Sequence, residues 1–171
     1  NHWNALWVPI ARANTILSAI DDVPFTSNDT KNQYIAELKF IRAFMYFNLV
    51  REFGDVPVIT ERMATPQQVA EYTFRVKREK VYEQIIADLK DVTGSNLPVS
   101  WPAAGKGRVS LQAANGLLGQ VYLTMATTLD AASRTDNLNN ARTYLLACFN
   151  QKGFTNLSDI PFQDVFSVDK K

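Results

Sequence analysis

Apolar residues recur at spacings of three and four along nearly the whole chain, which is the period of an α-helix rather than of a strand. The pattern predicts five main helices in series, joined by loops of variable length. The first helix is expected to bury one stripe made of Trp3, Leu6, Ile10, Ala13, Leu17 and Ile20. Pro9 lies inside this stripe, so we expect the helix to kink there or to begin there. Asp21, Asp22 and Pro24 are expected to end it.

The second helix is the most clearly specified. Thr30 and Gln33 have the spacing of a capping box, which predicts a start at Thr30. Gly54 provides the C-terminal stop. The apolar residues form two stripes, Leu38, Ile41, Met45 and Leu49 on one side and Phe40, Phe44 and Phe47 on the other. A helix that is apolar on two sides is expected to be sandwiched between neighbours.

The other helices follow after loops rich in breakers. Residues 60–74 are expected to form a loop, and the third helix to end near Gly94. Residues 94–108 form a second loop, after which Ser110 caps the fourth helix. The fourth helix carries small residues that would let another helix approach closely, namely Ala113, Ala114, Gly116 and Gly119.

The fifth helix is expected to be capped by Asp136 or Asn137 and to end before Gly153. Its inward face is predicted to be Leu138, Ala141, Leu145 and Cys148. The tail from Phe154 to Val168 shows no convincing period.

Five helices in series predict an all-α fold of tetratricopeptide-like helical hairpins, an α-solenoid of the right-handed superhelix type. A clean period near 34 residues is missing, and only the fourth and fifth helices carry the spacing of such a repeat. An irregular bundle therefore stays open as an alternative. We expect residues 1–171 to form a single helical domain.

Charge and composition narrow the possible partners. Eighteen Lys plus Arg against 17 Asp plus Glu give a formal net charge of +1, which argues against nucleic acid as the main partner. The densest basic cluster, Arg75, Lys77, Arg78 and Lys80, is interpreted as a solvated helix entrance. A single cysteine, Cys148, excludes an internal disulfide and a cysteine-based zinc site.

Both ends of the sequence look cut. No apolar run reaches the roughly 20 residues that span a bilayer. The chain begins at Asn1 without a methionine and stops at Lys171 without a capping signal. We therefore expect a fragment of a larger protein, truncated at both ends, whose signal or lipid anchor lies on the missing part.

Catalytic chemistry finds little support. The one histidine, His2, lies at the start of the chain, where a base has neither held geometry nor a partner. Residues 105–108 lack the hydroxyl and the spacing of a phosphate-binding loop. Paired acids could serve glycoside hydrolysis, but none of the candidates has an apolar setting that would raise its pKa: Glu37, Asp55, Glu61, Asp88 and Asp91. The sequence predicts no catalytic residue, no metal site and no cofactor.

The tryptophans are the best candidates for sugar contact. Trp3 lies on a helical core stripe and is expected to pack, whereas Trp7 lies one position off that stripe. Trp101, held in a loop, could offer its ring face to a sugar. Loop tryptophans also fold back as packing lids, so both interpretations of Trp101 stay open.

Four ordered blocks resemble the SusD/RagB family. The segments AELKFIRA (36–43), YFNLV (46–50) and FGDVP (53–57) resemble the family signature. The flanking matches are Trp3, Ile10, Ala13, Asn14 and Leu17 before it, Arg78, Val81, Tyr82, Ile85, Ile86, Asp88 and Leu89 after it, then Gly107, Arg108, Ala113, Ala114, Leu117, Leu118, Val121, Tyr122 and Leu123. The departures are Ala36 in place of the usual glycine and Gly119 in place of the usual alanine, the latter costing ~1 kcal/mol in a helix.

The resemblance implies a non-catalytic, lipid-anchored protein at the outer-membrane surface of Gram-negative bacteria. Such proteins lid a SusC-type TonB-dependent transporter and capture oligosaccharides or other nutrients. Their tetratricopeptide-like helices form the scaffold and face the transporter, while ligand residues lie mainly on flanking segments. No ligand-binding residue is therefore carried over by motif. The alternative from the fold alone is a tetratricopeptide-type adaptor that binds a peptide or protein partner.

Three positions within the blocks are expected to be structural. The 54–57 turn and Arg108 are interpreted in this way. Arg42, embedded in an otherwise apolar helix, is expected to pair with a buried acid or with helix carbonyls, because an unpaired buried charge is costly.

Overall fold

The computed structural model describes residues 1–153 and Asp159, and the tail predicted to lack a period otherwise lies outside these residues. The described chain is all-α, as predicted, with one isolated bridge between Val56 and Val76. Its elements are α1 (His2–Ala19), η1 (Ile20–Asp22), α2 (Asn28–Phe53), α3 (Pro66–Tyr72), α4 (Arg78–Thr93), η2 (Ala103–Gly105), α5 (Leu111–Thr128), η3 (Ala131–Ser133) and α6 (Arg134–Asn150). None of the described helices is long and apolar enough to cross a membrane.

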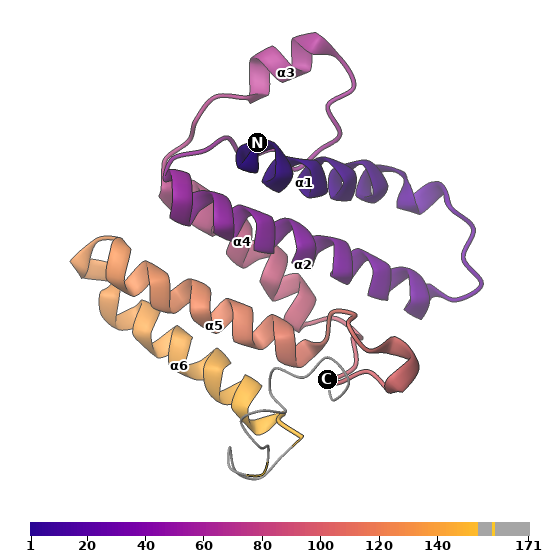
Figure 1. Cartoon of the computed structure of the whole chain (residues 1–171), viewed down its shortest axis with the longest axis vertical. Helices are drawn as coiled ribbons and strands as arrows, with labels where there is room; N and C mark the ends of the chain where they lie inside the picture. The colour runs from indigo at the N-terminus through magenta and orange to yellow at the C-terminus, as the bar shows by residue number, and fades with distance from the viewer. Residues whose placement is uncertain (154–158, 160–171) are drawn as a thin grey trace.

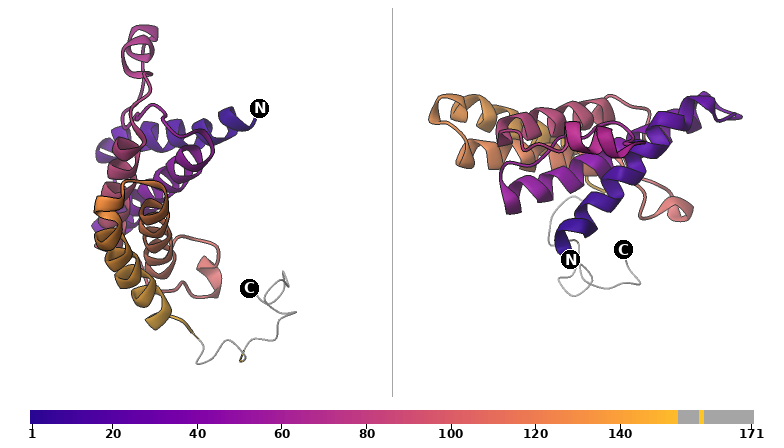
Figure 2. Two further views of the ribbon diagram at one scale, coloured as in Figure 1. Left: turned by 90° about the vertical axis from the view of Figure 1, so that its left-hand side faces the viewer. Right: turned by 90° about the horizontal axis from the view of Figure 1, so that it is seen from above.

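Each long helix packs mainly on the next long helix in the chain. α1 contacts α2, α2 contacts α4, α4 contacts α5, and α5 contacts α6. Figure 1 shows these helices stacked side by side, and the left view of Figure 2 shows that the stack follows a curve. A stack in which each hairpin buries its neighbour's apolar face is the architecture of a helical repeat.

The core follows the seam where α1, α2, α4 and α5 meet. Its largest fully buried aliphatic side chains are Ile10, Leu49, Ile85, Leu89, Leu118, Val56, Val81, Val92 and Val121. A smaller cluster of Ala36, Val92, Leu97 and Ala114 lies at one end, where Trp101 packs against it. Both clusters use residues of α2, α4 and α5, so the core runs across these three helices.

The predicted sandwich of α2 is only partly correct. Leu49 and Phe47 are buried, but Ile41 and Phe44 are 38% and 41% exposed. The neighbours of α2 explain the difference. α1 and α4 make its main contacts, and α5 contacts it at only a few residues, so Ile41 of the first stripe and Phe44 of the second stay exposed.

The structure confirms the helix ends predicted at Gly54 and Ser110. Gly54 ends α2 in a left-handed conformation, with φ +69°, which a side chain would strain. Ser110 caps α5 by accepting a hydrogen bond from the amide of Ala113, as predicted. The start of α2 was wrongly predicted, because Ser27 is the cap and accepts from the amide of Thr30. Thr30 is thus inside the first turn.

The predicted cap of the fifth helix is also wrong. α6 begins at Arg134, directly after a 3-10 turn in which Asp130 accepts from the amide of Ala132. Asn137 is buried and donates to the hydroxyl of Ser133 instead of capping. The turn joins the helix without a break, which moves the helix start ahead of Asp136.

Two further differences concern proline. α1 runs through Pro9 from His2, with Asn1 as its cap, so Pro9 is not the start. The expected loop at 60–74 contains α3, where Thr65 and Gln68 form a capping box around Pro66, the first residue of the helix. α3 buries none of its residues, and in Figure 2 it projects from the stack.

The close approach predicted for the small residues occurs between α5 and α6. A Cβ at Gly119 would lie 2.6 Å from Cγ of Leu145, and one at Gly116 would lie 3.3 Å from Sγ of Cys148. Ala141 is buried as expected, but Leu138 and Leu145 are 44% and 36% exposed. α6 is the last helix of the described stack, so only its side toward α5 is covered.

Gly119→Ala is expected to lower the free energy of unfolding by about 1–2 kcal/mol, because overpacking against Leu145 outweighs the gain in helix propensity. Urea denaturation followed by circular dichroism would measure the change. Gly153→Ala is the matched control, since its added Cβ meets nothing within 4 Å. A Gly119→Ala protein more stable than the parent would contradict the packing argument.

Candidate functional site

A buried ion pair joins the two central helices. Arg42 of α2 donates from Nε and Nη2 to the two carboxylate oxygens of Asp88 on α4, at 2.8 and 2.7 Å. The two side chains are only 7% and 3% exposed. This confirms the expectation that Arg42 pairs with a buried acid, and that acid is Asp88. A bidentate geometry of this kind compensates part of the cost of burying both charges.

The same arginine extends the network to the segment after α2. Its Nη1 donates to Oδ1 of Asn14 on α1 and to the carbonyl of Thr60, at 2.8 and 2.9 Å. Nδ2 of Asn14 donates to the carbonyls of Ile59 and Glu61, at 2.9 and 3.3 Å. We call the set of Asn14, Arg42, Tyr46 and Asp88 the buried hub.

Tyr46 completes the hub. Its hydroxyl donates to the carbonyl of Ile59 at 2.8 Å and accepts from the amide of the same residue at 2.7 Å. Burial raises the pKa of Tyr46, so the phenol stays protonated and can donate. The hub therefore fixes the backbone of residues 59–61 against α1 and α2.

The Trp101 loop packs against the N-terminal half of α2. The indole Nε1 of Trp101 donates to the carbonyl of Val109 at 2.6 Å, and the guanidinium of Arg108 lies 3.9 Å from the ring centroid. A Cβ at Gly105 would lie 2.9 Å from the same ring. These contacts are those of a packing lid, and sugar contact by Trp101 stays a prediction.

Arg108 ties this loop to α2. It donates from Nε and Nη2 to the carboxylate of Glu37, at 2.9 and 3.2 Å, and it lies 5.6 Å from the ring centroid of Tyr34. The hydrogen bonds to Glu37 are the main cause of a raised pKa of Arg108. The structural role expected of Arg108 fits these contacts.

Of the remaining candidate acids, Asp55 and Asp91 each bind a group on another part of the fold, and Glu61 is exposed. Asp55 accepts from the amide of Arg78 at 2.9 Å and so caps α4, which fits the structural role expected of the 54–57 turn. Asp91 pairs with Lys39 across α2 and α4 at 2.5 Å. The Glu61 side chain is exposed. Within the described residues, no group of three His, Cys, Asp or Glu side chains could hold a metal ion.

The aromatic residues of α1 pack on the end of α2. Trp3 meets Phe53 edge-to-face at 4.8 Å, which confirms a packing role, and Trp7 meets Tyr46 in the same way at 5.8 Å. His2 is exposed, as expected, but it lies 2.8 Å from Glu52, so the expectation that it has no partner is wrong. The basic residues at 75–80 are exposed at the start of α4, as expected of a solvated entrance.

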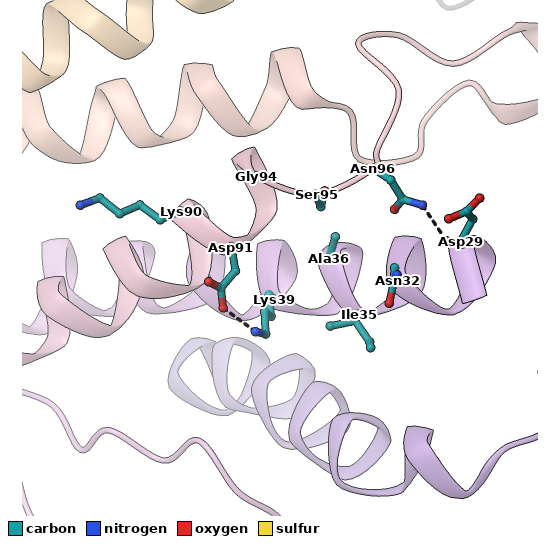
Figure 3. Close-up of a pocket in the computed structure, with 10 residues that line it drawn as sticks. All are labelled: Asp29, Asn32, Ile35, Ala36, Lys39, Lys90, Asp91, Gly94, Ser95 and Asn96. Carbon is teal, nitrogen blue, oxygen red and sulfur yellow. Dashed lines mark hydrogen bonds and ion pairs between the residues drawn. The ribbon is translucent and has the colours of Figure 1, made fainter. Parts of the chain in front are cut away.

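One hollow lies between the first turns of α2 and the end of α4 and has a volume of about 590 Å³. Figure 3 shows the Lys39–Asp91 pair on one side of it and Asn96 donating to the carbonyl of Asp29, at 3.2 Å, on the other. Ile35 and Ala36 also line it. Sequence reasoning missed this hollow, because its polar residues come from the surfaces of two helices about 50 positions apart and share no motif.

A second hollow of about 570 Å³ lies between α2, α5 and α6. Phe40, Phe44, Leu117, Leu145 and Cys148 line it. It is the opening left by the uncovered part of α2. Of the five candidate acids, only Asp91 lines the first hollow, and none of them lines the second.

The described helices form a stack of hairpins around a buried Arg–Asp–Asn–Tyr hub, which is the architecture of a tetratricopeptide-like helical scaffold. The profile of the SusD-like family, described as starch-binding and associating with the outer membrane, matches residues 1–123. The chain belongs to the SusD-like family. The resemblance carried by the four motif blocks is thereby confirmed.

The individual relatives agree with this assignment. A SusD-like protein of Formosa agariphila is 30% identical over 71% of this chain and 22% of its own length. The structure of a laminarin-binding SusD-like protein is 32% identical with a TM-score of 0.76, over 95% of this chain and 32% of that chain. A structure with a xylogluco-oligosaccharide is 26% identical with a TM-score of 0.74, over 91% and 30%.

These matches have two consequences. The tetratricopeptide-like fold class is confirmed by SusD-like structures that superpose along most of the chain. The chain spans about a quarter to a third of the length of these relatives. The activity and partners of the whole protein are therefore proposals.

Arg42→Met is expected to lower the free energy of unfolding by about 3–5 kcal/mol, because it leaves the Asp88 carboxylate buried and unpaired. The double variant Arg42→Met/Asp88→Leu should be more stable than Arg42→Met alone. Urea denaturation of the two singles and the double gives the coupling. Single effects that simply add in the double would contradict the hub as a coupled unit.

Arg108→Gln is expected to loosen the Trp101 loop, since it removes both the pair with Glu37 and the cation over the ring. Hydrogen–deuterium exchange of peptides covering 98–110 should speed up, with a stability loss of about 1 kcal/mol or less. Arg75→Gln, at an exposed arginine outside the loop, is the control. Unchanged exchange in Arg108→Gln would show that the loop is held by other contacts.

Proposed function

We propose that the full-length protein is a non-catalytic, nutrient-binding lipoprotein of the outer-membrane surface. It captures oligosaccharides and passes them to a SusC-type TonB-dependent transporter. The observation that carries the proposal is the family match over residues 1–123, together with the likeness to a laminarin-binding SusD-like structure over 95% of the chain. The lipid anchor belongs to a part of the protein outside this sequence.

In this proposal the helical part is the scaffold and the transporter-facing part. Its central structural feature is the buried hub, which ties α1, α2 and α4 to the segment at 59–61. Four of the five candidate acids contact a basic side chain or a backbone amide of another part of the fold. This use of the acids supports a structural rather than a hydrolytic role.

The ligand proposal rests on the relatives. One is named for laminarin binding and another was solved with a xylogluco-oligosaccharide. We propose a neutral oligosaccharide as the ligand, held mainly by segments flanking this chain, with Trp101 as a candidate contact. The alternative, a tetratricopeptide-type adaptor for a peptide or protein, draws on the helical-hairpin fold only.

The full-length protein is expected to bind laminarin or xyloglucan oligosaccharides in isothermal titration, and residues 1–171 alone are expected to lose most of that affinity. The flanking segments then supply most of the contacts. A peptide ligand with no sugar binding by the full-length protein would favour the adaptor. Full affinity in residues 1–171 alone would contradict the scaffold role.

A further inference from the structure

Two hollows adjoin along α1 and share Trp7 and Ile59 as a common wall. One has a volume of about 240 Å³ and is also lined by Trp3, Pro57 and Thr73. The other has a volume of about 160 Å³ and reaches Ala11, Asn14, Thr15, Glu61 and Arg62. We call the two hollows together the α1 trough.

One wall of the trough is fixed by the buried hub. Residues 59–61 receive hydrogen bonds from Asn14, Arg42 and Tyr46, each 3.3 Å or shorter. A segment held in this way keeps its place when a ligand binds, so little ordering entropy is lost on binding. Glu61 at the end of this segment and Arg62, the residue after it, have exposed side chains.

The trough has an aromatic end and a polar end. Trp3 and Trp7 are partly exposed, with their rings 5.6 Å apart and tilted by 57°. At the other end, the Glu61 carboxylate and the Arg62 guanidinium have no ion-pair partner among residues 1–153. The Glu61 carboxylate accepts hydrogen bonds and the Arg62 guanidinium donates them, and their opposite charges leave this end of the trough without net charge.

This distribution of groups fits a sugar. A sugar ring presents an apolar C–H face that packs on an indole, and a rim of hydroxyls that both donate and accept hydrogen bonds. Ligand sites in general combine mostly apolar walls with a few placed polar groups. The opposite charges of Glu61 and Arg62 favour neutral hydroxyls over a phosphate or a carboxylate, each of which would be repelled by Glu61.

We propose that the α1 trough is a subsite for a neutral oligosaccharide, with Trp3 and Trp7 packing on the rings and Glu61 and Arg62 binding hydroxyls. The inference rests on the proposed function, and it adds a sugar contact on the helical part itself. The trough is built by α1 and residues 57–73, whereas Trp101 lies with the α4–α5 loop.

The test is isothermal titration of the full-length protein with laminarin and xyloglucan oligosaccharides. Glu61→Gln/Arg62→Gln removes both charges at exposed positions, and Ala11→Trp fills the trough from an exposed position of α1. Each variant is expected to bind about tenfold more weakly. The double glutamine variant loses hydrogen bonds to charged groups, and the tryptophan variant keeps the sugar ring out of the trough. Ala87→Trp, at an exposed alanine of α4, should bind as the parent does.

The outcomes separate the two proposals. If the parent protein binds none of these oligosaccharides, the proposed function fails and the subsite fails with it. If the parent binds and both trough variants bind equally well, the proposed function stands and the subsite is wrong. Thermal unfolding of each variant shows whether a loss of binding comes from a loss of folding. A weaker but fully folded Glu61→Gln/Arg62→Gln protein supports the subsite.

Discussion

The bidentate pair between Arg42 and Asp88 is the contact on which the rest of the structure depends. Both charges are almost fully removed from water, so each needs the other to offset the cost of its burial. A shift of either helix would leave a buried charge without its partner. The free guanidinium nitrogen reaches Asn14 of α1 and the carbonyl of Thr60. One side chain thus fixes three helices and one irregular segment.

A second ion pair follows the same seam. Lys39 and Arg42 lie one turn apart on α2, and Asp91 and Asp88 lie one turn apart on α4. The two pairs therefore form a ladder between the helices, one rung buried and one exposed. The buried rung sets the register, since the exposed pair contributes little to stability in water.

The buried core of the stack and its exposed surfaces carry different kinds of side chain. The interior is occupied by the hub and by aliphatic packing. Exposed or half-exposed aromatic side chains lie at the α1 trough and on the open side of α2, and the trough also carries the exposed charges of Glu61 and Arg62. A scaffold of this kind can keep its core while its loops and surfaces vary. That property suits a family whose relatives are named for different glycans.

The sequence by itself determined the five long helices but not the short α3, the ends of α2 and α4 at their glycines, the pairing of Arg42 with an acid and the family. These features are local or carried by ordered motifs, so periodicity and spacing suffice. Only the tertiary structure decided that Asp88 rather than Asp91 is the buried acid. Both acids pair with a basic residue of α2, but the Asp88 side chain is buried and that of Asp91 is exposed. It also decided that Gly119 admits Leu145, that α6 stays open on one side, and that Trp7 and residues 59–61 form one trough. These outcomes depend on contacts between segments distant in the chain, and helical periodicity carries no information about which neighbour covers which face.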